Sequence, residues 1–272
     1  MMLLADAGNS RLKWSTYYKG KRSTQLAQNY SQYTPDIVLI NLLQHNIANS
    51  IHIISELLLV SVLGKVFAQK IQSYCQLNNI QLDIIHSHSE AYGVKNSYLQ
   101  PQRLGADRFV SLIAAHHLRS QSHCIVVSCG TAVTIDALTV QGQHLGGLIL
   151  PGLQQFADKL IKNTVLLSRK NTEKITLFAN NTADGLASGS VFGLVEAING
   201  ISSRMEGELL KMTHLRGNQP TMYPIKIILC GGDAAILHPY LADSVQREDD
   251  WLMQGLQVIA DIMVVSKQSA SK

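Results

Sequence analysis

The chain has 272 residues, is 46% hydrophobic, and carries 23 basic and 19 acidic side chains for a formal net charge of +4. That length supports one large domain or two packed lobes with a sizeable core. The basic residues are scattered, which argues against nucleic-acid binding, while a modest basic surplus suits an anionic substrate.

The apolar stretches and the cysteines exclude further classes of protein. The longest apolar stretch covers residues 57–63 and is far shorter than the roughly 18 residues that span a bilayer. No secretory signal pattern precedes the first apolar strand, so we expect a cytoplasmic protein without a membrane segment. The four cysteines form no CxxC pair, which favours reduced core thiols over disulfides or a zinc site. Cys129 lies in a glycine turn, so a nucleophilic role stays open for it.

In chain order, the first half alternates strand and helix signals. Hydrophobic periodicity predicts a β-hairpin over residues 2–18, a helix over 36–48, one or two strands over 51–63, a helix over 64–77 and a strand over 82–86. This order is typical of an α/β lobe. A helix over residues 105–118 carries apolar residues at helical spacing, and we expect it to join the two halves.

The second half begins again with strands. The pattern predicts strands over 124–128, 132–138 and 145–150, a helix over 152–164, a long helix from about 182 to 212, and a buried strand over 225–230. Gly185, Gly189 and Gly193 share one face of the long helix. We therefore expect a neighbouring helix, a partner subunit or a ligand to pack closely there.

Two short segments, residues 3–14 and 126–136, share one plan. Each has an apolar run, a tight polar turn with glycine and a small hydroxyl or amide residue, and a second strand-like run. Glycine lets backbone N–H groups approach phosphate oxygens, and a carboxylate at the turn can hold a metal ion. The alternative is two ordinary hairpins, but the repetition favours a pair of phosphate-binding turns.

Two other groups of residues carry candidate chemistry. Gly105, Asp107 and Arg108 begin the helix over 105–118, which places a carboxylate that can take a proton beside a guanidinium that can hold an anion. A capping Asp with a surface Arg is the alternative. Gly231 and Gly232 join a strand to a helix and permit close approach of a nucleotide's sugar or base, although a plain tight turn has the same pattern.

Several motifs in order identify a family resemblance. They are Asp6-x-Gly8-Asn9-x-x-x-Lys13, Leu104-Gly105-Ala106-Asp107-Arg108, Gly130-Thr131-Ala132-Val133-Thr134-Ile135-Asp136, Gly146-Gly147-x-x-x-Pro151-Gly152 and Gly231-Gly232-Asp233. From residue 3 to about 257 the chain resembles the type III pantothenate kinases of the acetate and sugar kinase/Hsp70/actin superfamily. The resemblance implies two duplicated ribonuclease H-like α/β lobes with mixed sheets flanked by helices and an ATP cleft between them, over residues 1–118 and 119–272.

The resemblance also implies an activity and its requirements. The activity is ATP-dependent phosphorylation of the primary hydroxyl of pantothenate, the first step of coenzyme A synthesis. The implied cofactors are Mg²⁺ with the nucleotide and a monovalent cation, K⁺ or NH₄⁺. The implied assembly is a homodimer with the active site at the subunit interface.

By motif, the resemblance assigns roles to individual residues. Asp107 resembles the general base, and Arg108 the residue that binds the pantothenate carboxylate. The other pantothenate-contacting positions are Tyr92, Gly105 and Thr182, the last from the partner subunit. Asp6 corresponds to the Mg²⁺ position and Asp136 to the monovalent-cation position. The positions around ATP are Asp6, Gly8, Asn9, Lys13, Gly130, Thr131, Gly231 and Gly232.

One position departs from the family pattern. The family commonly carries Asp where this chain has Ser128, so one carboxylate near the metal is missing and altered metal dependence is expected. Two alternatives stay open. An accessory regulator of transcription on the same scaffold is disfavoured because Asp6, Lys13 and Asp107 are retained, and a sugar or acetate kinase is disfavoured because Tyr92 and Arg108 suit an anionic amide substrate.

Overall fold

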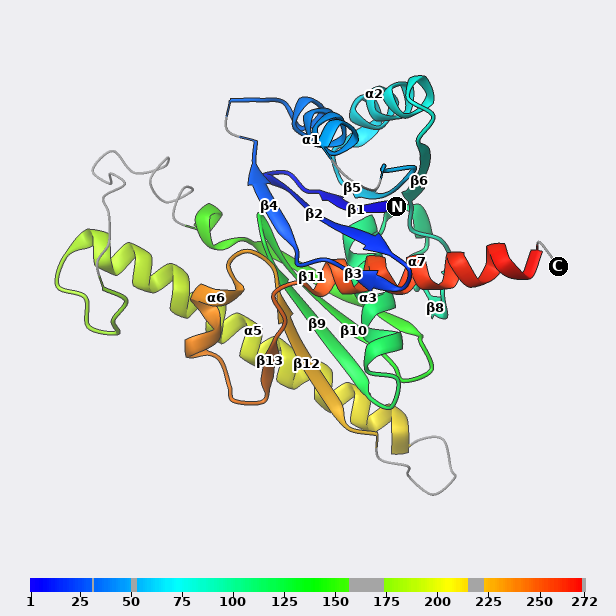
Figure 1. Ribbon diagram of the computed structural model, residues 1–272. Helices are drawn as coiled ribbons and strands as arrows, with labels where there is room; N and C mark the ends of the chain where they lie inside the picture. Colours follow the sequence, from blue (N-terminus) through cyan, green and yellow to red (C-terminus); the bar gives the residue numbers. More distant parts are fainter. Residues whose placement is uncertain (31, 50–52, 157–173, 215–222, 271–272) are drawn as a thin grey trace. The chain divides into compact units, whose positions relative to one another are not determined.

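The computed structural model describes residues 1–30, 32–49, 53–156, 174–214 and 223–270. The chain divides into two compact units, one formed by residues 1–117 and 250–272 and the other by residues 118–249. Each unit has its own β-sheet with helices packed on it (Figure 1). The division after residue 117 lies beside the boundary expected at residue 118. Residues 250–272, which the sequence analysis assigned to the second lobe, belong to the first unit.

The first unit is built on a mixed sheet with strand order β3-β2-β1-β5-β6, and β4 pairs with β2. β1 is antiparallel to β2 and parallel to β5, and β5 is parallel to β6. The strands are β1 (Met2–Ala7), β2 (Arg11–Tyr18), β3 (Lys21–Arg22), β4 (Leu26–Asn29), β5 (Glu56–Ser61) and β6 (Gln81–Ile85). All six residues of β1 are buried, as expected for a strand with both faces covered.

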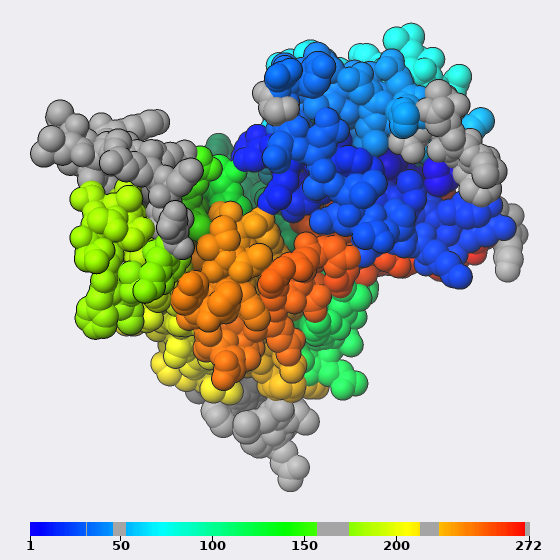
Figure 2. Space-filling view, turned by 60° about the vertical axis from the view of Figure 1, so that its left-hand side comes forward, coloured from blue at the N-terminus to red at the C-terminus, as the bar shows by residue number. Residues whose placement is uncertain are grey.

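Helices cover both faces of this sheet. The helices of this unit are α1 (Pro35–Asn49), α2 (Gly64–Leu77), α3 (Ala106–Leu118) and α7 (Trp251–Ala270). α1 and α2 pack on the face that carries Leu3, Leu57 and Leu59, and they lie at the top of this unit in the space-filling view (Figure 2). Strand alternation places the neighbouring residues on the opposite face. α7 packs against β1 and β2.

α7 joins the first unit because its buried side contacts elements of that unit. Trp251 is 1% exposed and its indole Nε1 donates a hydrogen bond to the carbonyl oxygen of Ser111 in α3, at 3.1 Å. Gly255 lies so close to α3 that an added Cβ would stand 2.6 Å from the carbonyl oxygen of Val110. No helix was predicted here from the sequence, and the two contacts with α3 explain why this segment belongs to the first unit.

The second unit repeats the plan of the first. Its sheet has strand order β11-β10-β9-β12-β13, with antiparallel pairing from β9 to β11 and parallel pairing from β9 to β13. The strands are β9 (His123–Cys129), β10 (Ala132–Leu138), β11 (His144–Pro151), β12 (Ile225–Cys230) and β13 (Val245–Arg247). Each unit thus has a three-stranded antiparallel run followed by two parallel strands, so the expected duplicated α/β lobes with mixed sheets are confirmed.

The long helix α5 (Thr182–His214) covers one face of the second sheet. Its buried residues Val191, Val195 and Ile198 pack with Ile125 and Val127 of β9. The short helices are α6 (Ala234–Leu237), η1 (Pro101–Arg103) and η2 (His238–Tyr240). Among the described residues, no helix is both long enough and apolar enough to cross a membrane.

Most predicted elements are present, with local differences. The region 51–63 forms the single strand β5, and residues 51–52 lie outside the described residues. Residues 153–156 are helical, while 157–164 of the predicted helix also lie outside them. Besides α7, the elements that the sequence did not predict include the short strands β7 (Glu90–Ala91) and β8 (Val94–Lys95), because strands of two residues leave no periodic pattern.

Candidate active site

The first glycine turn joins β1 to β2 and places Asp6 opposite Lys13. The two residues are register partners across the hairpin, and Lys13 Nζ lies 3.7 Å from Asp6 Oδ2. Gly8 closes the turn by donating its backbone N–H to the carbonyl oxygen of Arg11, at 3.2 Å. Asn9 is exposed at the tip. The hairpin therefore brings together four of the residues expected around ATP.

Asp6 has a strongly shifted titration because it is 8% exposed. Its pKa is raised from 3.8 to about 6, chiefly by burial; the positive charge of Lys13 opposes this shift and the negative charge of Asp107 adds to it. The influence of Asp107 means that the first turn of α3 lies within electrostatic reach of the glycine turn. A cation bound near Asp6 would favour its ionised form.

The fit of this region to Mg²⁺ follows from its donor set. Within the described ranges, no group of three His, Cys, Asp or Glu side chains is arranged to hold a metal ion. Mg²⁺ is usually bound through one or two carboxylates together with phosphate oxygens and water. Asp6 supplies one such carboxylate, so the residues present fit Mg²⁺ that arrives with a nucleotide.

Asp107 is fixed at the start of α3. Its Oδ1 accepts a hydrogen bond from the backbone N–H of Arg108, at 2.8 Å. An added Cβ at Gly105 would stand 2.6 Å from the same oxygen, so glycine at 105 leaves room for this carboxylate. The N-terminus of a helix stabilises negative charge. An ionised carboxylate in this position can accept a proton.

Arg108 lies next to Asp107 and is 7% exposed. Its Nη1 donates a hydrogen bond to the hydroxyl of Tyr98, at 2.8 Å, and its Cζ lies 5.5 Å from the centre of the Tyr98 ring. No role for Tyr98 followed from the sequence, because a contact between a loop tyrosine and an arginine ten residues later leaves no local pattern.

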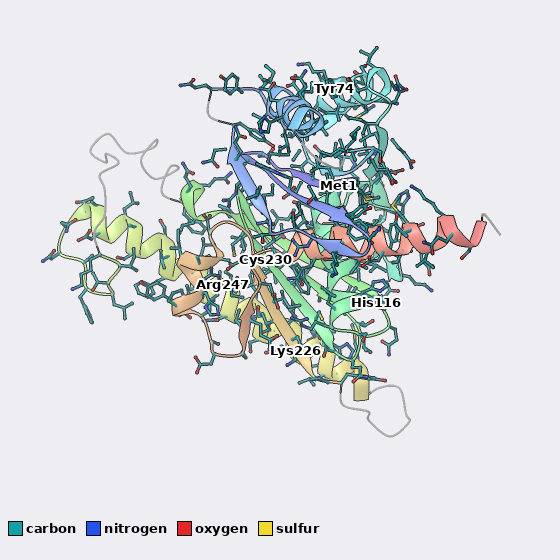
Figure 3. All side chains as sticks on the ribbon, in the orientation of Figure 1. Met1, Tyr74, His116, Lys226, Cys230 and Arg247 are labelled. Atoms are coloured by element: carbon teal, nitrogen blue, oxygen red, sulfur yellow. The ribbon has the colours of Figure 1, made fainter. Side chains whose placement is uncertain are left out.

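Tyr92 occupies a tight turn that is attached to the end of α3. It adopts a left-handed conformation with φ of 52°, and its carbonyl oxygen lies 2.9 Å from Nε2 of His117. An added Cβ at Gly93 would stand 2.6 Å from the ring of His116, which is labelled in Figure 3. Burial raises the pKa of the Tyr92 hydroxyl, and the charge of Asp83 adds to the shift. One helix therefore positions Tyr92, Asp107 and Arg108.

The second glycine turn, residues 129–131, is held by two distant segments. Gly152 donates its N–H to the carbonyl oxygen of Thr131 at 3.2 Å, and an added Cβ there would stand 2.5 Å from that oxygen. Gly231, with φ of +99°, follows Cys230 at the end of β12 (Figure 3), and its Cβ would meet the carbonyl carbon of Cys129 at 2.6 Å. The structure thus brings Gly130, Thr131 and Gly231 together, and Gly232 is the next residue.

Cys129 itself is a packed thiol. It is buried in the second turn, and burial raises its pKa far above the ordinary range, with Cys230 and Asp233 adding to the shift. A thiol with a raised pKa supplies little thiolate and is a poor nucleophile. The structure therefore gives Cys129 a packing role.

Asp136 and Thr182, the other predicted positions in the second unit, have different surroundings. Asp136 is 2% exposed on β10, and its Oδ1 lies 2.9 Å from Nε2 of His144 on β11. Gly147 on β11 is the register partner of Asp136, and an added Cβ there would meet the Asp136 carboxylate and stand 2.5 Å from the carbonyl oxygen of Ile135, so glycine at 147 leaves room for this side chain. Thr182 is exposed at the first residue of α5, directly after Asn181, whose side chain accepts the N–H of Asp184 at 3.0 Å.

Comparison with known proteins adds independent information. A family model described as type III pantothenate kinase matches residues 2–204. A protein of Nitrosococcus oceani named type III pantothenate kinase is 30% identical over 272 residues, covering 96% of this chain and 94% of the relative.

Solved structures agree on the fold. A structure described as a Baf family transcriptional activator from Campylobacter jejuni superposes with a TM-score of 0.55 at 21% identity, covering 95% of this chain and 98% of the other. MreB 5 of Spiroplasma citri reaches 0.50 at 9% identity, covering 99% and 98%. At such low identity these likenesses bear on architecture alone.

Proposed function

Because the chain belongs to the type III pantothenate kinase family, it is an ATP-dependent pantothenate kinase of coenzyme A biosynthesis, and we propose that Asp107 is its general base. The observation that supports this role is the placement of Asp107: a carboxylate at a helix N-terminus, beside buried Arg108 and within electrostatic reach of Asp6. Phosphoryl transfer requires charge neutralisation and alignment more than covalent chemistry by the protein.

In the proposed reaction, the carboxylate of Asp107 accepts the proton of the primary hydroxyl of pantothenate. The alcohol oxygen forms a bond to the γ-phosphorus of ATP while the bond from that phosphorus to the bridging β–γ oxygen breaks. ADP leaves with the bond electrons. The roughly in-line arrangement of the two oxygens reflects the ordinary geometry of this transfer.

Substrate binding is proposed for the residues around α3. The Arg108 guanidinium matches the carboxylate of pantothenate in charge and shape. Gly105 lets the substrate approach the backbone, and Tyr92 lies in the turn attached to the same helix. Thr182 is exposed at the start of α5, which is compatible with a contact to substrate from the partner subunit of a homodimer.

The two glycine turns are proposed to contact ATP. Gly8 and Gly130 support this role because an added Cβ at either would be tolerated by the chain itself: its nearest described neighbours would be backbone oxygens at 3.5 and 3.9 Å. Neither residue has positive φ. Glycine at these positions is therefore explained by the close approach of a ligand rather than by the fold. The other proposed contacts are Asp6, Asn9, Lys13, Thr131, Gly231 and Gly232.

Two cations complete the proposal. Mg²⁺ bound with the nucleotide would neutralise charge on the phosphates, and Asp6 would be its protein ligand. A monovalent cation, K⁺ or NH₄⁺, is proposed at Asp136, whose buried carboxylate contacts His144. If this site is correct, K⁺ should raise the rate of the wild-type enzyme more than Na⁺ does, and Asp136→Asn should weaken the effect of K⁺. Equal rates in the two salts would argue against the site. A cytoplasmic location is part of the same proposal.

A coupled assay of ADP release with pantothenate, ATP, Mg²⁺ and K⁺ tests the catalytic role. Removal of a general base costs about 10²–10⁴-fold in rate, so we expect Asp107→Asn to lose at least about a hundredfold in kcat while circular dichroism stays unchanged. Tyr33→Phe, at an exposed position of the same unit, serves as the matched control. Turnover of a sugar but not of pantothenate by the wild-type protein would reject the substrate, and full activity of Asp107→Asn would reject the base.

A further inference from the structure

The side chain of Arg108 is buried, so its orientation must be set by the protein. Burying a guanidinium is costly unless polar groups contact it. Tyr98 contacts it in two ways: the hydroxyl accepts a hydrogen bond from Nη1 at 2.8 Å, and the ring faces the cation with Cζ 5.5 Å from its centre. Because Tyr98 is neutral, it holds the arginine without cancelling its positive charge.

Tyr98 is itself held in place by Asn96. The side-chain oxygen of Asn96 accepts the backbone N–H of Tyr98 at 3.0 Å. The side-chain nitrogen of Asn96 donates to the carbonyl oxygen of Pro101 at 3.0 Å and to the hydroxyl of Ser87 at 3.1 Å. The Asn96 amide thus uses its oxygen as an acceptor and its NH₂ group as a donor to two partners. Asn96 therefore connects three parts of the loop before α3 and fixes the position of the Tyr98 backbone.

We infer that Tyr98 is a positioning residue that orients the Arg108 guanidinium toward the carboxylate of the substrate. A guanidinium recognises a carboxylate through two parallel N–H groups, so its affinity depends on the plane in which it is held. The contact with the hydroxyl and the contact with the ring together define that plane. The inference rests on the proposed role of Arg108 in binding pantothenate.

Tyr98→Phe tests the inference because it keeps the ring and removes only the hydroxyl. A hydrogen bond to a charged group contributes more than one between neutral groups, so we expect the KM for pantothenate to rise about tenfold. The kcat and the KM for ATP are expected to stay within about twofold. Tyr33→Phe, with a side chain 54% exposed in the same unit, should leave all three constants unchanged.

A double-mutant cycle with Arg108→Lys distinguishes positioning from a separate contact. If Tyr98 acts through Arg108, the loss caused by Tyr98→Phe disappears in the Arg108→Lys background. Additive losses would overturn the inference, and so would an equal rise in the KM for ATP, which would indicate a general structural defect. Failure of the wild-type protein to phosphorylate pantothenate would instead reject the proposed function, so the two failures are distinguishable.

Discussion

The first glycine turn, between β1 and β2, is held by its own hairpin, whereas the second, at residues 129–131, is held by two segments from elsewhere in the chain. At the first turn two charged side chains, Asp6 and Lys13, form an ion pair. At the second turn the backbone is packed closely against two glycines, Gly152 and Gly231. Similar local sequences are thus proposed to have different roles: the first turn carries the proposed Mg²⁺ ligand, and the backbone of the second is the proposed contact for phosphate.

The largest effect is expected from removing the negative charge of Asp6 at the first turn. Asp6→Asn keeps the size of the side chain but removes the proposed Mg²⁺ ligand, so we expect kcat/KM for MgATP to fall at least about a hundredfold. Titration of activity with Mg²⁺ measures the change. If Asp6→Asn keeps the Mg²⁺ dependence of the wild type, the charge at the first turn does not serve to bind Mg²⁺.

The same carboxylate is expected to reduce stability at neutral pH. A raised pKa means that the folded protein binds the proton of Asp6 more tightly than the unfolded chain does. For this group the stability is greatest below about pH 4, declines as the pH rises to about 6, and is level above that. Without Mg²⁺ at pH 8, Asp6→Asn should therefore raise the free energy of unfolding by up to about 3 kcal/mol.

Urea denaturation at pH 8 and at pH 4 checks this expectation, because the stabilising effect should shrink at the lower pH. Destabilisation by Asp6→Asn at pH 8 would contradict it. If Asp6→Asn loses activity and gains stability, the buried carboxylate of Asp6 is needed for activity and not for folding.

Gly152→Ala tests the packing that holds the second turn. Its Cβ would stand 2.5 Å from the carbonyl oxygen of Thr131, so the turn must shift. We expect the KM for ATP to rise about tenfold and the free energy of unfolding to drop by about 1–3 kcal/mol. Gly207→Ala is a matched control because, apart from its chain neighbours and the nearby backbone of its own helix, no described atom lies within 4 Å of its added Cβ. Unchanged ATP binding in Gly152→Ala would show that the turn tolerates displacement.

Gly130→Ala separates the needs of the ligand from those of the fold. The nearest described neighbour of its added Cβ is a backbone oxygen at 3.9 Å, so the melting temperature should stay within about 2 °C of wild type. If phosphate approaches this backbone, the KM for ATP rises about five- to tenfold. A thermal melt and ATP kinetics on one preparation check both halves, and unaltered ATP kinetics would exclude Gly130 from the binding surface.

The smallest effect is expected from restoring a carboxylate to the second turn. Ser128 is half-buried at the end of β9, paired in register with Thr134 and Cys230. Ser128→Asp would add a negative charge beside Gly130, and we expect the concentration of cation needed for half-maximal activity to fall about two- to fivefold. Titrations of activity with Mg²⁺ and with K⁺ show which of the two dependences changes. If neither changes, Ser128 contributes to neither cation site.

The sequence by itself determined the elements that depend on local patterns. The hairpins, α2 and α3 followed from hydrophobic periodicity and turn residues, and the ordered motifs indicated the family. The family motif also placed Asp6 and Lys13 around the same ATP phosphates.

Only the tertiary structure decided what depends on contacts between distant segments. It assigned α7 to the first unit through Trp251 and Gly255, gave Asp136 a partner in His144, and brought Tyr98 to Arg108. Burial, which raises the pKa of Asp6, likewise arises from both faces of the sheet being covered. Local sequence carries no record of such contacts, since packing depends on how residues far apart in the chain share the same space.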